Sequence, residues 1–222
     1  MIVRRFGLAV GLLMLASTSQ AQQKEPIGPF VIDLRMVSSG LPSGPGWTPL
    51  LPAATMVPSR GLGFEVGTHV NVLRRRSMAL GIGGTWLVAR GSTSPPALPE
   101  ATTSTGTQIV PDVTTRVTGL APQLSLNFGH SLGWSYLSVG LGRTRAESEA
   151  TLAGGATTFA PRDSARVKTL NYGGGARWFV TDRLGVGFDL RWHKVGLVPA
   201  SATHPGAGRA SLLVAGAGIV LK

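Results

Sequence analysis

The segment Asn171–His193, which reads NYGGGARWFVTDRLGVGFDLRWH, constrains the fold of this chain more than any other stretch. Two sets of residues alternate in its second half: Val186, Phe188, Leu190 and Trp192 on one face, and Gly187, Asp189, Arg191 and His193 on the other. A soluble antiparallel sheet buries its apolar face, whereas a transmembrane barrel turns that face to lipid and keeps polar residues inside. Aromatic residues on the apolar face and charges of both signs on the opposite face favour the barrel.

The same alternation recurs along the chain and predicts eight strands. They are Phe30–Val37, Gly61–Leu73, Met78–Ala89, Arg116–Phe128, Trp134–Thr144, Val167–Phe179, the strand through Val186–Trp192, and Arg209–Leu221. A tilted strand needs roughly 9–11 residues to cross a bilayer, a length that the first strand alone falls short of. An even number of strands is typical of bacterial barrels. The predicted fold class is therefore all-β, an eight-stranded antiparallel up-and-down transmembrane β-barrel.

The connections between these strands alternate in length. Short links follow the second, fourth and sixth strands, at Arg74–Ser77, Gly129–Gly133 and Val180–Arg183. Long links rich in small and turn-forming residues follow the first, third, fifth and seventh strands, at Ser38–Arg60, Arg90–Thr115, Arg145–Arg166 and Gly196–Gly208. Short periplasmic turns and long external loops are the pattern of an outer-membrane barrel. A soluble sandwich gives no reason for it.

The N-terminus indicates export. Arg4 and Arg5 precede the apolar run Phe6–Ala16, and Ser19-Gln20-Ala21 offers small residues for cleavage before Gln22. Such a sequence is typical of a cleaved signal peptide, and its apolar run is too short for a membrane helix. We expect a signal peptide at 1–21, a periplasmic N-terminal segment at 22–29 and a barrel domain at 30–222. The expected location is the outer membrane of a Gram-negative-type bacterium.

Composition narrows the function classes. The chain has no cysteine, so an exported form relies on hydrogen bonds and packing rather than on disulfides. Its net charge of +11, or +9 after signal-peptide removal, is scattered rather than gathered on one stripe, and we expect no nucleic-acid partner. Its four histidines, His69, His130, His193 and His204, lack metal-ligand spacing, so neither a metal nor a cofactor is predicted. The cluster Arg74-Arg75-Arg76 falls at a turn, where it meets water or anionic head groups.

Charged residues at inward positions predict a filled lumen rather than a conduit. The expected charge network contains Asp33, Arg35, Glu65, His69, Arg177, Asp189 and Arg191. Eight strands enclose a space only wide enough for side chains, and buried charges there must pair. We expect Arg177 to reach Asp189 diagonally across the short turn, and Arg191 to reach Asp189 or, across the lumen, Asp33 or Glu65. No catalytic residue is assigned.

Aromatic residues predict two girdles at the membrane interfaces. Phe30, Phe128 and Trp178 are expected at the periplasmic rim, and Phe64, Trp86 and Trp192 toward the outer rim. Trp134 and Tyr136 break the alternation of their strand, which implies either a β-bulge or a strand that starts inside the rim.

With its signal peptide, eight amphipathic strands and the GGGARWFVTDRLGVGFDLRWH hairpin, the chain resembles the small outer-membrane β-barrel proteins of the OmpA-transmembrane-domain or OmpX type. From the strand alternation, the alternating lengths of the links and the paired girdles, we predict a monomer with a structural, adhesive or surface-interaction role. Outer-membrane lipid, lipopolysaccharide and the barrel-insertion machinery are its expected partners. The alternatives are a small pore, a lipid-A-modifying hydrolase or acyltransferase that uses a histidine such as His193, and a secreted lipocalin-like binding barrel.

Overall fold

The structure, a computed structural model, describes residues 25–43, 46–47, 56–94, 112–151, 158–159, 166–200 and 206–222. The expected signal peptide at 1–21 lies outside the described residues. None of the described segments forms a helix with the length and hydropathy of a membrane span.

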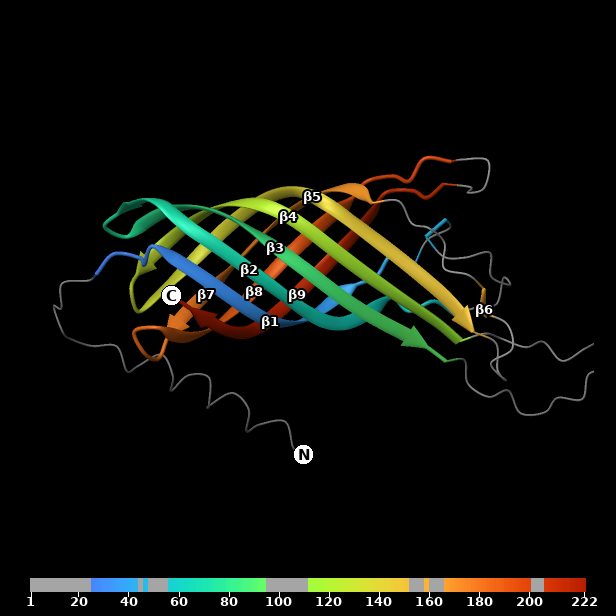
Figure 1. Ribbon diagram of the computed structural model, residues 1–222, viewed down its shortest axis with the longest axis horizontal. Helices are drawn as coiled ribbons and strands as arrows, with labels where there is room; N and C mark the ends of the chain where they lie inside the picture. The colour runs from blue at the N-terminus through green and yellow to red at the C-terminus, as the bar shows by residue number, and fades with distance from the viewer. Residues whose placement is uncertain are drawn as a thin grey trace, which may run out of the picture.

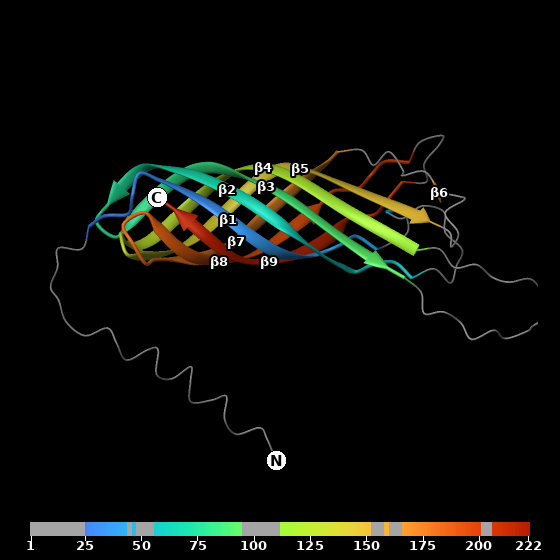
Figure 2. The same cartoon turned by 60° about the horizontal axis from the view of Figure 1, so that its bottom comes forward.

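Eight long antiparallel strands close into a barrel (Figures 1 and 2). They are β1 (Phe30–Gly40), β2 (Arg60–Arg75), β3 (Met78–Thr93), β4 (Asp112–His130), β5 (Gly133–Thr151), β7 (Val167–Phe179), β8 (Leu184–Val195) and β9 (Ala210–Leu221). Each pairs with its neighbour in sequence, and β1 also pairs with β9, which closes the sheet. The predicted fold class, an eight-stranded antiparallel barrel, is confirmed.

Several strands are longer than the sequence pattern indicated, at the end that carries the long connections (the loop end). β5 continues through Thr151, so Glu147 lies in a strand and not in a loop as expected. A two-residue strand, β6 (Thr158–Phe159), pairs with the end of β5 and was not expected. In this extension small inward residues alternate with charged outward ones, as Ala146 does with Glu147. The extension therefore lacks the apolar alternation that indicates a membrane-facing strand.

The outward positions of the wall form an apolar belt. In β8 the belt runs from Leu184 to Trp192, and in β5 its large residues end at Leu141. Nine residues of a tilted strand suffice to cross the hydrocarbon core of a bilayer, and Leu184–Trp192 has that length. Large apolar side chains are thus exposed on the wall, while polar ones are buried inside it.

The opposite end of the barrel carries the short turns and both ends of the described chain (the turn end) (Figure 1). The segment before β1 lies against this end: the Ser131 amide donates to the Glu25 carbonyl (3.0 Å), and the Asn71 amide donates to the Pro29 carbonyl (2.7 Å). The Lys222 amine donates to the Ser131 carbonyl and lies 4.3 Å from the centre of the Phe179 ring. Burial lowers the pKa of that amine, against the opposing effect of nearby carboxylates.

Trp134 and Tyr136 both point into the lumen, where they are almost fully buried. The pairing of β4 with β5 keeps a single register on both sides of these residues, from Leu120 with Arg143 to His130 with Gly133. The strand therefore starts inside the rim, and the alternative of a bulge is wrong.

Candidate functional site

The middle of the lumen holds the charged residues that the sequence singled out. Their side chains come from β1, β2, β7 and β8 and are at most 4% exposed: Asp33, Arg35, Glu65, His69, Arg177, Asp189 and Arg191. Their inward direction follows from the two-residue period of a strand, because each shares a face with inward glycine or small polar residues. Buried charges are tolerated only where partners compensate for lost hydration.

Arg177 and Asp33 form a bidentate ion pair across the lumen. The Nε and Nη2 atoms of Arg177 donate to the two carboxylate oxygens of Asp33 at 2.9 and 2.8 Å. Arg177 lies opposite Gly187 in the register, as expected, but the expected contact of Arg177 with Asp189 is wrong. The Tyr136 ring explains the difference: it lies 3.8 Å from the guanidinium carbon of Arg177, and its hydroxyl donates to Asp189 (2.6 Å).

Tyr136 connects the two halves of the network. Its hydroxyl accepts a hydrogen bond from Arg35 Nη2 (2.9 Å) and donates one to Asp189 Oδ2. Arg35 also pairs with Asp33 (2.9 Å) and with Glu65 (2.7 Å). Five of the seven predicted residues, Asp33, Arg35, Glu65, Arg177 and Asp189, thus belong to one connected network.

Arg191 completes this network on β8. Its Nε and Nη2 atoms donate to the two carboxylate oxygens of Asp189 at 3.0 and 2.9 Å. Of the partners expected for Arg191, the structure brings Asp189 into contact. Sequence reasoning missed the role of Tyr136, although the signal was present: an inward aromatic residue with a hydroxyl near charges of both signs.

His69 is not hydrogen-bonded to this network. Its ring is buried, and neither of its nitrogens has a hydrogen-bond partner among the described residues. It does not contact Glu65 through a hydrogen bond or ion pair in this part of the chain. The described residues contain no group of three or more histidine and acidic side chains that could hold a metal.

Apolar side chains close both ends of the lumen. At the turn end the buried cluster is Ile27, Val31, Ala79, Trp134, Phe179 and Val220. At the loop end a second cluster includes Leu41, Trp47, Val117, Val198 and Leu212, and the Trp47 indole donates to the Gly208 carbonyl (2.8 Å). The charged middle is therefore separated from solvent on both sides.

The six aromatic residues assigned to girdles all lie on the outside of the wall, between 37% and 51% exposed: Phe30, Phe64, Trp86, Phe128, Trp178 and Trp192. Some contact each other or a neighbouring ring. Phe64 and Trp86 meet edge to face at 5.3 Å, and Tyr172 stacks on Trp192 at 5.9 Å.

Comparison with known proteins gives a match in fold but not in sequence. No protein-family profile matches the chain, and no curated protein matches it in sequence. Among solved structures, Neisserial surface protein A matches with a TM-score of 0.52 at 13% identity, covering 88% of this chain and 97% of that one. OprG, an outer membrane protein of Pseudomonas aeruginosa, matches with a TM-score of 0.45 at 11% identity, covering 90% and 97%. Ail, the attachment invasion locus protein of Yersinia pestis, matches with a TM-score of 0.44 at 12% identity, covering 87% and 99%. The closed barrel and the match to Neisserial surface protein A show that this chain has the fold of the small outer-membrane β-barrel proteins.

Proposed function

We propose that this chain is an integral outer-membrane protein whose filled barrel anchors the long connections at the cell surface, where they have a structural, adhesive or surface-interaction role. The observation that carries this proposal is the inversion of polarity across the wall. Leu137 and Leu141 are more than 60% exposed on the outside, whereas Asp33 and Arg191 are fully buried inside. Such a wall is stable where lipid replaces water around it.

The inversion argues against a secreted lipocalin-like barrel. A soluble barrel that binds an apolar ligand needs an apolar cavity and a polar outer surface. Here the centre of the lumen is occupied by a hydrogen-bonded ionic network, and the outer wall is apolar.

The pore alternative is disfavoured by the two apolar clusters that cap the network. The position of His193 does not support the alternative of a lipid-A-modifying enzyme. Its side chain is buried inside the barrel and does not lie on the wall that lipid would contact. Each of the eight long strands pairs with a neighbour on both sides, which supports a monomer that is complete by itself.

Heat-modified electrophoretic mobility and cell fractionation test this proposal together. A folded barrel resists detergent at room temperature, so the unboiled protein should migrate differently from the boiled protein and should be recovered with outer membranes. Identical mobility, with recovery in the soluble periplasmic fraction, would contradict the proposal.

A further inference from the structure

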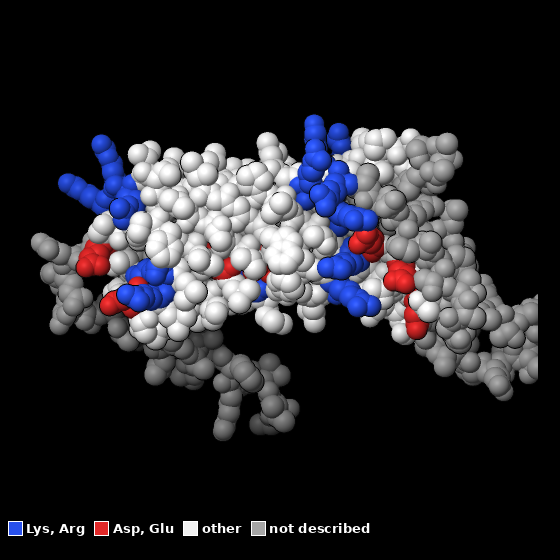
Figure 3. Space-filling view, in the orientation of Figure 1, with Lys and Arg blue, Asp and Glu red and all other residues white. Residues whose placement is uncertain are grey.

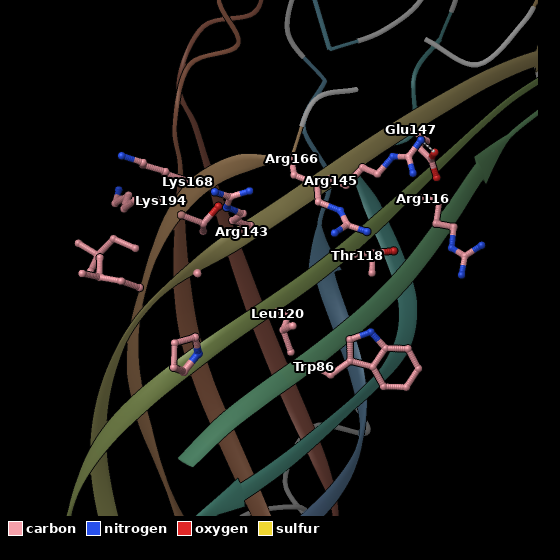
Figure 4. A pocket seen from close by; sticks show the side chains of 15 residues that line it. Trp86, Arg116, Thr118, Leu120, Arg143, Arg145, Glu147, Arg166, Lys168 and Lys194 are labelled. Carbon is pink, nitrogen blue, oxygen red and sulfur yellow. Dashed lines mark ion pairs between the residues drawn. The ribbon is translucent and has the colours of Figure 1, made fainter. Parts of the chain in front are cut away.

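A groove on the outer wall, where the apolar belt meets the loop end, carries an inference that rests on the proposed membrane location. It has a volume of about 1070 Å³ and crosses β4, β5, β7 and β8 (Figure 4). Its floor is apolar and is formed by Leu120, Pro122, Leu141 and Leu170, with Trp86 at one side. Its remaining lining is dominated by cations: Arg116, Arg143, Arg145, Arg166, Lys168 and Lys194.

The strand pairing is irregular at the floor of this groove, where Pro122 and Gly142 lie. Pro122 cannot donate to the ladder, and the pairing of β4 with β5 is interrupted between Leu120–Arg143 and Gln123–Gly140. Gly142 lies beside this interruption, where a Cβ atom would come within 2.2 Å of the Leu120 carbonyl oxygen. The close approach of β4 and β5 at this point of the wall therefore requires glycine.

On three strands, the outward-facing residue next to the edge of the apolar belt is a cation. Leu141 precedes Arg143 on β5, Lys168 precedes Leu170 on β7, and Trp192 precedes Lys194 on β8. Successive outward-facing residues lie roughly 6.6 Å apart along a strand. Arg143 pairs in register with Lys168, so cations from neighbouring strands lie side by side directly beyond the belt.

Among the described residues that line this groove, six are cations and one is a carboxylate. Glu147 lies among the lining cations and pairs with Arg145 (2.7 Å). Among the described residues, no ion pair involves Arg116, Arg143 or Lys168. Figure 3 shows lysine and arginine side chains gathered at the loop side of the uncharged wall.

We propose that this groove binds a phosphorylated glycolipid of the outer leaflet, with phosphate groups against Arg143 and Lys168 and acyl chains along Leu141 and Leu170. Arginine and lysine are the side chains suited to phosphate oxygens. A soluble anion would leave the apolar floor uncovered, whereas a neutral lipid would leave the cations without counter-charges. A phosphorylated acylated sugar satisfies both parts of the surface.

Titration of the detergent-solubilised full barrel with diphosphorylated lipid A, followed by native mass spectrometry, tests this assignment. The double variant Arg143→Gln/Lys168→Gln removes two charges from the groove, and Arg74→Gln/Arg75→Gln removes two from the turn end as a matched control. At about 1 kcal/mol for each cation near an anionic lipid surface, the groove variant should bind about 30-fold more weakly. The control should bind like the wild type, and dephosphorylated lipid A should bind wild type and groove variant equally weakly.

Three results would overturn the assignment. Equal weakening in the groove and control variants would mean that overall charge governs binding. Undiminished binding of dephosphorylated lipid A would remove the role of phosphate. Displacement of lipid A by an equal concentration of inorganic pyrophosphate would identify a soluble anion as the ligand. Heat-modified mobility of each variant separates these results from failure of the proposed function, because a wild-type chain that shows no heat shift refutes the membrane barrel itself.

Discussion

At the scale of single residues, Arg177 shows how the barrel holds a charge without water. Its guanidinium donates to both oxygens of Asp33 and lies 3.8 Å from the centre of the Tyr136 ring. A third contact runs to the Asn127 amide oxygen (3.3 Å). Paired hydrogen bonds and a cation–π contact offset the large cost of removing the ion from water.

Substitution of Asp189 tests whether the network is dry. Asp189→Ala leaves Arg191 buried without its carboxylate partner and removes the acceptor of the Tyr136 hydroxyl. We expect the free energy of unfolding to fall by roughly 3–5 kcal/mol. Urea unfolding in detergent micelles measures this change.

Glu147→Ala is the matched control, because it also removes a carboxylate from an arginine. That pair is about one-third exposed on the outer face of β5, so its loss should cost at most about 1 kcal/mol. Equal, small effects of the two substitutions would indicate a wet, wide lumen and would favour the channel alternative.

At the scale of elements, the glycines of β7 set how closely β8 and the lumen side chains approach. A Cβ atom at Gly175 would lie 2.0 Å from the Phe188 carbonyl oxygen and 2.9 Å from the Tyr136 hydroxyl. The first contact is with backbone, which cannot rotate away. Gly175 therefore makes room for the tyrosine that connects the charge network.

Gly175→Ala should consequently destabilise the barrel by about 1–3 kcal/mol, the usual cost of overpacking. Gly208→Ala serves as its control, because a Cβ atom at Gly208 meets nothing within 4 Å. Thermal unfolding of both variants in detergent is the measurement. If the two alanine variants unfold at the same temperature, the proposed close packing around Tyr136 is wrong.

The sequence predicted the positions of the strands better than it predicted the side-chain contacts across the lumen, for a physical reason. Alternation depends on the two-residue period of a strand, so it located the strands and the inward direction of residues such as Arg177 and Asp33. Contacts across the lumen depend on the shape of the closed barrel, which no single strand encodes. The pairing of Arg177 with Asp33 rather than Asp189, and the central position of Tyr136, therefore emerged only with the fold.

At the scale of the whole molecule, the lumen is arranged in layers that oppose conduction. The ionic network occupies the middle, and apolar clusters around Trp134 and Trp47 close the two ends. Planar-bilayer recordings of the purified protein should show no stable unitary current. Large, stable steps would mean that the lumen opens, and the protein would then be a pore.

We propose that lipid surrounds the barrel wall and that the long connections face outward from the cell. Because the chain contains no cysteine, single substitutions provide unique labelling sites. Suitable positions are Ala200→Cys at the loop end, Val139→Cys in the belt and Val180→Cys at a short turn, all exposed in the absence of lipid.

Labelling of these three variants in cells with a membrane-impermeant maleimide is the most direct test. Cys at 200 should react on intact cells, Cys at 180 only after the outer membrane is permeabilised, and Cys at 139 only after denaturation. Reaction at 139 as fast as at 200, in folded protein, would show that water covers the wall and would contradict the membrane barrel.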